Sequence, residues 1–189
     1  MVDRFLELLF GANQLKRVLR TGWVMRGVAD AESVADHAFG VAFTALMLAE
    51  LEETPVDGSK LLAIALLHDL PEAVLSDIPA PALRYLSSTA KADAEREVLS
   101  TLLQRIPWRD KWRAWWYEYE HQSSLEAKLV RDADQLDVLV QAYVYERTTG
   151  NRWLDEFWME STRASLGCET SRALFDALWE IRDKGVPDK

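Results

Sequence analysis

The sequence predicts an all-α fold, and three observations support this. Apolar residues recur at three- and four-residue spacings through most of the 189 residues, which is the period of a buried helical face. No stretch of useful length alternates apolar and polar residues as a half-buried strand would. Gly and Pro are few, at 8 and 6 residues, and several of them fall in the connections between periodic segments. We therefore expect one helical domain over residues 1–189 with a substantial core.

The first two predicted helices follow from apolar spacing and from a capping residue. The first has apolar side chains at spacings of four, three and four, which should form one buried face: Leu8, Ala12, Leu15 and Leu19. A polar connection containing Gly22 and Gly27 follows. The second helix should begin after Ser33, a good N-cap residue, with Asp36 as the acid of a shortened capping box. Its core face should carry Val34, Val41 and Leu48.

The third predicted helix ends at a His-Asp pair. Ser59 can cap this helix, which runs through the apolar residues 61–67. Pro71 disfavours a helical conformation at the residue before it, so His68-Asp69 should lie in the last turn or just past it. The following residues 77–81, Asp-Ile-Pro-Ala-Pro, form a poor helix and should be an ordered loop.

The second half of the chain is predicted to be helical as well. Residues 88–105 are charged and amphipathic, and Pro107 separates them from a helix with an aromatic stripe at Trp108, Trp112, Trp115 and Tyr119. Such a stripe is more often a core or dimer contact than a ligand platform. A long helix should run from about Ser124 to Thr148, and two shorter helices within residues 151–184 should complete the domain.

Composition and charge exclude several classes of function. A net charge of −9 argues against a surface for polymeric nucleic acid, although a local cation can still attract a small anion. Cys168 is the one cysteine, so no internal disulfide and no cysteine-based zinc site is expected. The N-terminal residues lack the basic-then-apolar layout of a signal peptide, and no apolar stretch reads as long enough to span a bilayer. We expect a cytoplasmic protein that does not bind membranes.

His68-Asp69 is the most informative chemical feature. An imidazole and a carboxylate on consecutive residues are good ligands for a divalent metal. Burying them beside an apolar run costs free energy unless something compensates their polarity, which a bound cation would do. His37 follows Asp36 on the second helix and could reach the same ion if the helices pack side by side. An isolated His-Asp pair is more often a helix end that faces water, so the pair alone does not establish a metal site.

A further ligand could come from the long helix, which carries three acids in an apolar context: Asp132, Asp134 and Asp137. At roughly 100° per residue, Asp134 shares a face with Asp137, whereas Asp132 lies about 200° away from Asp134. This argument makes Asp132 a poorer candidate. It does not choose between Asp134 and Asp137, and any one of the three could be a solvated surface charge.

Five separated blocks in this order resemble the HD-domain metal-dependent phosphohydrolases and, more closely, their 5′-deoxynucleotidase branch. The blocks are LKRVLRTGW (residues 15–23), ESVADH (32–37), LHDLPEA (67–73), SDIP (76–79) and KLVRDADQL (128–136). The resemblance covers about residues 13–148. It implies a single HD-domain helical bundle with a central metal site, while the helices within 151–184 add no motif.

The resemblance also assigns roles to residues of this chain. It implies one divalent ion, Mn²⁺, Co²⁺, Fe²⁺ or Zn²⁺, held by His37, His68, Asp69 and Asp134. It implies that Glu72 is the general acid/base and that Asp77 positions or activates the attacking water. In bacterial members an adjacent Arg-Trp pair contacts the phosphate and the sugar. Here Thr21-Gly22 separates Arg20, a possible phosphate ligand, from Trp23, which could close off the ribose 2′ position.

The expected function is hydrolysis of the 5′-phosphate of deoxyribonucleoside monophosphates by a homodimer, for which the aromatic stripe is a possible contact surface. One alternative is an HD-type phosphodiesterase or pyrophosphohydrolase acting on another nucleotide. A second is a non-catalytic, metal-stabilised helical binding protein, and Glu72 and Asp77 argue against it because a purely structural metal site would not need them. Base preference, strictness for deoxyribose and the physiological metal do not follow from the sequence.

Overall fold

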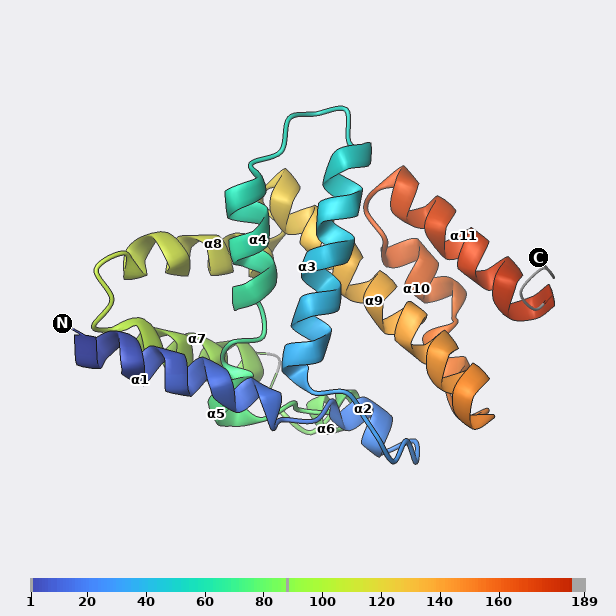
Figure 1. Ribbon diagram of the computed structural model, residues 1–189, viewed down its shortest axis with the longest axis horizontal. Helices are drawn as coiled ribbons and strands as arrows, with labels where there is room; N and C mark the ends of the chain where they lie inside the picture. The colour runs from blue at the N-terminus through green and yellow to red at the C-terminus, as the bar shows by residue number, and fades with distance from the viewer. Residues whose placement is uncertain (1, 88, 185–189) are drawn as a thin grey trace. The chain divides into compact units, whose positions relative to one another are not determined.

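The described chain contains helices and connections only, apart from one isolated β-bridge between Leu19 and Ser33. The computed structural model describes residues 2–87 and 89–184 (Figure 1). Over these residues the predicted all-α class is confirmed. The elements are α1 (Val2–Asn13), the 3-10 helix η1 (Gln14–Lys16), α2 (Thr21–Val24), α3 (Val34–Leu51), α4 (Gly58–Leu67), α5 (Glu72–Leu75), α6 (Ala80–Leu83), α7 (Ala90–Leu103), α8 (Arg109–His121), α9 (Leu125–Thr149), the 3-10 helix η2 (Asp155–Phe157), α10 (Glu160–Ser165) and α11 (Glu169–Lys184).

These elements form two compact units. Unit 1 contains the chain up to Ala38 together with Leu66–Tyr117, and unit 2 contains Phe39–Ala65 together with the chain from Glu118 onward. Helices α3, α4 and α8 contribute residues to both units. The expected single domain over residues 1–189 stays a prediction, and its residues 1, 88 and 185–189 lie outside the described part of the chain.

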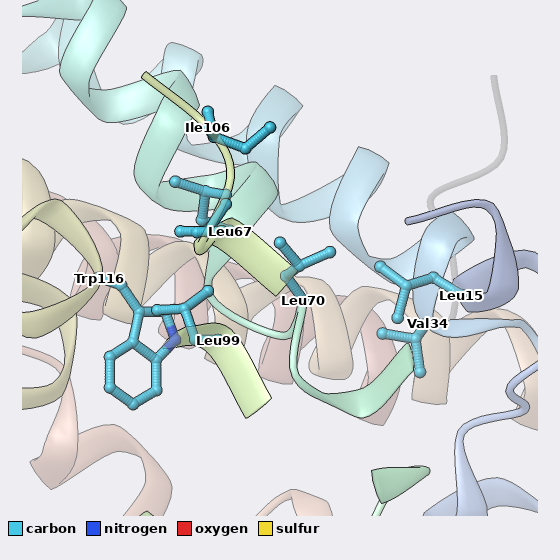
Figure 2. Packing of buried hydrophobic residues seen from close by; sticks show 8 residues of the cluster. Leu15, Val34, Leu67, Leu70, Leu99, Ile106 and Trp116 are labelled. Carbon is cyan, nitrogen blue, oxygen red and sulfur yellow. The ribbon is translucent and has the colours of Figure 1, made fainter. Parts of the chain in front are cut away.

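Unit 1 has its own apolar core, which surrounds the turn after α4. Figure 2 shows the buried cluster, whose members are Leu15, Val34, Leu67, Leu70, Leu99, Leu103, Ile106 and Trp116. Helix α1 packs along α7 and α5 against this core (Figure 1). Trp116 is 1% exposed and donates its indole N–H to the backbone carbonyl of His68 at 3.1 Å. The core therefore fixes the backbone of one predicted metal ligand.

One predicted core position is wrong. Leu19 is 48% exposed, whereas Leu15 is buried and Leu8 and Ala12 pack against the cluster. The predicted helix would have placed all four on one face, but α1 ends at Asn13 and η1 ends at Lys16. Leu19 instead lies in extended chain that pairs with Ser33.

The predicted cap of α3 is confirmed. The backbone N–H and the hydroxyl of Ser33 donate to Asp36 Oδ2 at 2.9 and 2.7 Å, and the backbone N–H of Asp36 donates to Ser33 Oγ at 3.2 Å. These bonds satisfy backbone groups that a helix start otherwise leaves without partners. The predicted core face is confirmed too, since Val34, Val41 and Leu48 are all buried.

The predicted cap of α4 is wrong. This helix begins at Gly58, and Ser59 already lies within it. The capping residue is Asp57, whose carboxylate accepts from the backbone N–H of Lys60 at 3.1 Å. Asp and Ser are about equally good capping residues, so the sequence alone did not show whether the helix begins after Asp57 or after Ser59.

Helix α3 bears on the expectation that no uninterrupted apolar stretch is long enough to span a bilayer, since Asp36, His37 and Glu50 interrupt its apolar residues. Its 18 residues have a mean hydropathy of 1.4, and by length and composition it is the one helix in the described chain that could cross a membrane. The core helix of a folded domain meets the same criteria. In the structure 33% of α3 is buried, including Val41, Ala45 and Leu48, and a single helix of this kind is weak evidence for a membrane span.

The aromatic stripe belongs mainly to the interior of the protein. Tyr119 is 5% exposed, and Trp112 packs against the core cluster of unit 1. Trp108 is 43% exposed and stacks on Phe5 of α1 with ring centroids 5.6 Å apart. The stripe thus contributes to the interior through Tyr119 and Trp112, and its part in a dimer contact stays a prediction.

In unit 2, helix α9 is the central element, and α10 and α11 lie beside it (Figure 1). Ser124 caps α9 as predicted, because its hydroxyl oxygen accepts from the backbone N–H of Ala127 at 3.3 Å. Gly40 of α3 lies against the carboxylate of Asp137, so a Cβ at this position would come within 2.7 Å of Asp137 Cγ. A Cβ at position 40 would therefore require the Asp137 carboxylate to shift.

Candidate metal centre

Three of the four predicted metal ligands come together in unit 1. His68 Nε2 lies 3.2 Å from Asp69 Oδ2, and His37 Nε2 lies 3.8 Å from the same oxygen. One ligand atom from each of the three residues lies within 4.8 Å of the others. Both imidazoles are buried, at 0% and 4% exposure for His37 and His68. The arrangement can hold a small cation.

Local structure explains how these side chains meet. Helix α4 ends at Leu67, and the turn that follows is closed by a bond from the N–H of Leu70 to the carbonyl of Leu67 at 3.1 Å. The predicted position of His68-Asp69, just past the last helical turn, is confirmed. His37 lies in the first turn of α3, held by the Ser33 cap. Two helix ends therefore present the ligands.

The charge on Asp69 is favoured by its neighbours. Burial acts to raise the pKa of Asp69, but the charge and the hydrogen bond of His68 lower it, and so do the charges of Arg20 and His37. The balance holds the pKa of this carboxyl well below its usual range. Arg20 Nη1 lies 3.4 Å from Asp69 Oδ2. Asp69 is therefore an ionised carboxylate, as a metal ligand must be.

Glu72, the predicted acid/base, is buried in unit 1, and its role in catalysis stays a prediction. It is the first residue of α5, it is 4% exposed, and its Oε2 has no hydrogen-bond partner among the described residues. Burial and then the charges of Asp69 and Asp77 raise its pKa to about 9, against the opposing charges of Arg20 and Lys91. Without a bound cation, Glu72 is therefore protonated at neutral pH.

This raised pKa predicts how the stability of the metal-free protein depends on pH. Because the folded-state pKa of about 9 exceeds the ordinary value of 4.5, the contribution of Glu72 is fully present below pH 4.5 and is lost as pH rises towards 9. The loss is at most about 1.4 kcal/mol per pH unit. We expect the Tm of EDTA-treated Glu72→Gln to exceed that of the wild type increasingly between pH 5 and 9. Parallel Tm curves for the two proteins would contradict the raised pKa.

Asp77 is held by the segment that also carries Arg20. The hydroxyl of Thr21 donates to the backbone carbonyl of Asp77 at 2.6 Å, and the N–H of Thr21 donates to Asp77 Oδ2 at 2.5 Å. Arg20 and Thr21 thus contact two acids that are both predicted to act in the site. The roles of Arg20 and Asp77 towards a substrate stay predictions.

Trp23 is a buried residue of unit 1. Its side chain is 2% exposed, and its indole N–H donates to Glu32 Oε1 at 2.8 Å. Its predicted role at the ribose 2′ position stays a prediction.

The three acids of α9 have different surroundings within unit 2. Asp132 is 2% exposed and accepts from the backbone N–H groups of Gly167 and Cys168, both at 2.8 Å. It is therefore a structural acid and not a solvated one. Asp134 accepts from the Tyr119 hydroxyl at 2.9 Å and lies 3.4 Å from Arg131 Nη1. Its predicted role as the fourth metal ligand stays a prediction.

Sequence reasoning missed several residues around the centre. Trp116 supports the backbone of His68, and Thr21 holds Asp77. Lys91 of α7 pairs with Glu95 at 2.7 Å. Burial acts to lower the pKa of Lys91, but Glu95 and then the charges of Asp69 and Glu72 raise it. Of these, only Thr21 carried a sequence signal, because it lies within the LKRVLRTGW block.

A family model described as HD domain matches residues 12–173. The chain belongs to the HD-domain family. The 5′-deoxynucleotidase HDDC2 of Danio rerio is 37% identical over 85% of this chain and 79% of that protein. The 5′-deoxynucleotidase HDDC2 of Xenopus laevis is 32% identical over 98% of this chain and 89% of that protein. These matches confirm the predicted family.

Several solved structures share the fold of this chain. A conserved hypothetical protein from Pyrococcus furiosus is 38% identical, with a TM-score of 0.78 over 94% of this chain and 99% of that one. The PH0347 protein from Pyrococcus horikoshii OT3 is also 38% identical, with a TM-score of 0.76 over 97% and 99%. A predicted metal-dependent phosphohydrolase from Magnetospirillum magnetotacticum MS-1 is 21% identical, with a TM-score of 0.73 over 97% and 93%, and supports the fold alone.

The donor atoms of the centre suit a divalent metal ion. Two buried imidazole nitrogens and one ionised carboxylate oxygen converge on a small volume. This mixed N and O set fits first-row divalent ions such as Mn²⁺, Fe²⁺, Co²⁺ and Zn²⁺. Fewer than four protein ligands from this unit would leave positions for water and substrate, which a catalytic site requires.

Proposed function

We propose that this HD-domain protein is a metal-dependent 5′-deoxynucleotidase, which hydrolyses deoxyribonucleoside 5′-monophosphates to the deoxynucleoside and phosphate. The observation that carries the proposal is the His37, His68 and Asp69 cluster with the buried carboxyl of Glu72 one helical turn beyond it. The names of the curated relatives support the choice of substrate.

His37, His68 and Asp69 would hold one divalent ion, with Asp134 proposed as the fourth ligand. Such an ion, when bound, supplies Lewis-acid chemistry that lowers the pKa of water and offsets negative charge on phosphate. Arg20 faces Asp69 at 3.4 Å, and its guanidinium can bind the phosphate as it arrives. This contact would hold the phosphorus close to Glu72.

Glu72 would move the proton in this reaction. The attacking water forms a bond to phosphorus, and its proton passes to Glu72 Oε2, the buried oxygen without a partner among the described residues. The bond from phosphorus to the 5′-oxygen breaks, and the same carboxyl returns the proton to that oxygen. To accept a proton Glu72 must first be ionised, and added positive charge in the cluster lowers its pKa from the value of about 9. Asp77 would orient the water.

A substrate panel tests the proposal. Phosphate release should occur with dAMP, dGMP, dCMP and TMP in the presence of Mn²⁺ or Co²⁺, and it should be lost with excess EDTA. The corresponding ribonucleotides measure strictness for deoxyribose. A phosphodiester and a nucleotide pyrophosphate ester test the alternative HD-type activities. Metal binding without release from any phosphate ester would instead support the metal-stabilised binding protein.

We further propose a homodimer in the cytoplasm, with a single metal ion in each copy. Trp108 is the most exposed residue of the aromatic stripe and the one that can contribute to a contact between copies. Light scattering after gel filtration measures the mass against that of the 21.6 kDa chain. Metal analysis of the dialysed protein gives the ratio of ion to chain.

A further inference from the structure

We propose that Thr21 is a positioning residue, whose hydroxyl and backbone N–H hold Asp77 in the orientation that the site uses. The inference rests on the proposed function, because Asp77 acts on water only if the reaction takes place. Thr21 need not contact the substrate, because it affects the reaction only by holding Asp77 in place.

The contacts between Thr21 and Asp77 fix both parts of the acid. The Thr21 hydroxyl holds the backbone carbonyl at 2.6 Å, and the Thr21 N–H holds the carboxylate at 2.5 Å. Hydrogen bonds to an ionised acceptor are among the strongest in proteins. Backbone and side chain together leave Asp77 little freedom to turn. The two residues are 56 positions apart, so this contact joins two separate segments of unit 1.

The residue before Asp77 gives an independent observation. Ser76 has φ 62° and ψ 168°, a backbone conformation that is almost confined to glycine. Such a conformation persists only where surrounding contacts determine it, and these conformations are common at functional sites. The N–H of Ser76 donates to the carbonyl of Glu72 at 2.9 Å, and Thr21 holds the next residue. These two hydrogen bonds fix the backbone between Glu72 and Asp77, and so they fix where Asp77 lies relative to Glu72.

The position of Asp77 matters to Glu72. The charge of Asp77 is one of the causes that raise the pKa of Glu72, after burial and Asp69. A change in the orientation of Asp77 would therefore change both the water contact and the electrostatic field at the proton-transferring group. Arg20, next to Thr21, contacts Asp69 in the same way. One dipeptide thus positions two acids of the centre.

Three substitutions test the inference. Thr21→Val removes the hydroxyl and keeps the backbone N–H, whereas Thr21→Ser keeps both donors. Thr162→Val is the matched control, because the Thr162 hydroxyl also donates to a backbone carbonyl, that of Phe157 at 3.2 Å. For Thr21→Val we expect kcat to fall about tenfold, the equivalent of one hydrogen bond, with KM within about twofold of wild type. Thr21→Ser and Thr162→Val should keep the wild-type kcat.

Hydrogen exchange gives a readout that does not depend on turnover. In metal-free Thr21→Val the amides of residues 76–78 should exchange faster than in wild type, while Thr21→Ser should match wild type. Wild-type kcat together with wild-type exchange in Thr21→Val would overturn the inference. A wild-type protein that releases no phosphate would instead overturn the proposed function.

Ser76→Gly provides a second test if Thr21→Val does not fold. Glycine adopts the conformation of Ser76 without cost and also populates others. We therefore expect a stable protein whose kcat falls with little change in KM, because Asp77 gains freedom. Unchanged kcat in this variant would count against the positioning of Asp77 by the 76–77 turn.

Discussion

Replacing His68 by Ala should abolish metal binding and phosphate release together, which is the largest effect expected from any single substitution. His68 provides an imidazole nitrogen 3.2 Å from the carboxylate of Asp69 in a centre with few other ligands. Loss of a residue that only orients a metal ligand already costs about 10–100-fold in affinity or activity. Loss of the ligand itself should exceed this. Metal content after dialysis, and initial rates with dAMP, measure both effects.

His121→Ala is the matched control for His68→Ala. His121 is the third histidine of the chain, and it lies exposed at the end of α8. We expect wild-type metal content and wild-type rates for this variant. Trp116 bonds to the backbone carbonyl of His68, so this support of the turn survives the change of side chain. A His68→Ala protein with full metal content would show that the ion lies elsewhere.

The family could be predicted from the five sequence blocks. The positions of the metal ligands in unit 1 could be predicted because local features of the chain determine them. Pro71 disfavours helix at the residue before it, so His68-Asp69 falls just past the end of α4, and the Ser33 cap fixes the start of the helix that carries His37. Each feature acts within a few residues of the ligand, so spacing in the sequence translates directly into position. The proximity of the two segments came from the resemblance and from the packing of helices in general, and not from spacing.

Features that depend on distant partners could not be predicted in this way. Trp116 was not expected to act at the centre, yet its N–H donates to the carbonyl of His68, 48 residues earlier in the chain. Asp132 was judged by its helical face alone, whereas its partners lie 35 and 36 residues later, at Gly167 and Cys168. A helical wheel gives the direction of a side chain relative to its own helix. The wheel cannot show that a later segment of the chain, here residues 167–168, covers the face on which Asp132 lies.

Asp134 and Asp137 illustrate the same limit. The helical face could not separate them, and the resemblance selected Asp134. Within unit 2, Asp134 is engaged by Tyr119 and Arg131, while Asp137 lies against Gly40. Both of these contacts are made through Asp134 Oδ2. Metal content of Asp134→Asn and Asp137→Asn would distinguish the two acids.

Replacing Glu72 by Gln should leave metal binding intact and reduce kcat by about 10²–10⁴-fold, the usual contribution of a general acid/base. Gln keeps the size of the side chain but can neither accept the water's proton nor return it to the leaving oxygen. Glu72 is not among the three clustered ligand residues, so the metal content should equal that of wild type. Steady-state rates with dAMP, and metal analysis of the same samples, measure the two properties separately.

Glu126→Gln is the matched control, because Glu126 is also a buried glutamate but belongs to unit 2. It lies 3.1 Å from Lys60 Nζ and accepts from the N–H of Asp57 at 3.0 Å, which identifies a structural role. We expect this variant to lose some stability and to keep its kcat. Equal kcat in wild type and Glu72→Gln would remove Glu72 from the mechanism. Equal losses of metal and kcat would instead make Glu72 a ligand of the ion, since a carboxylate that binds the metal contributes to both properties.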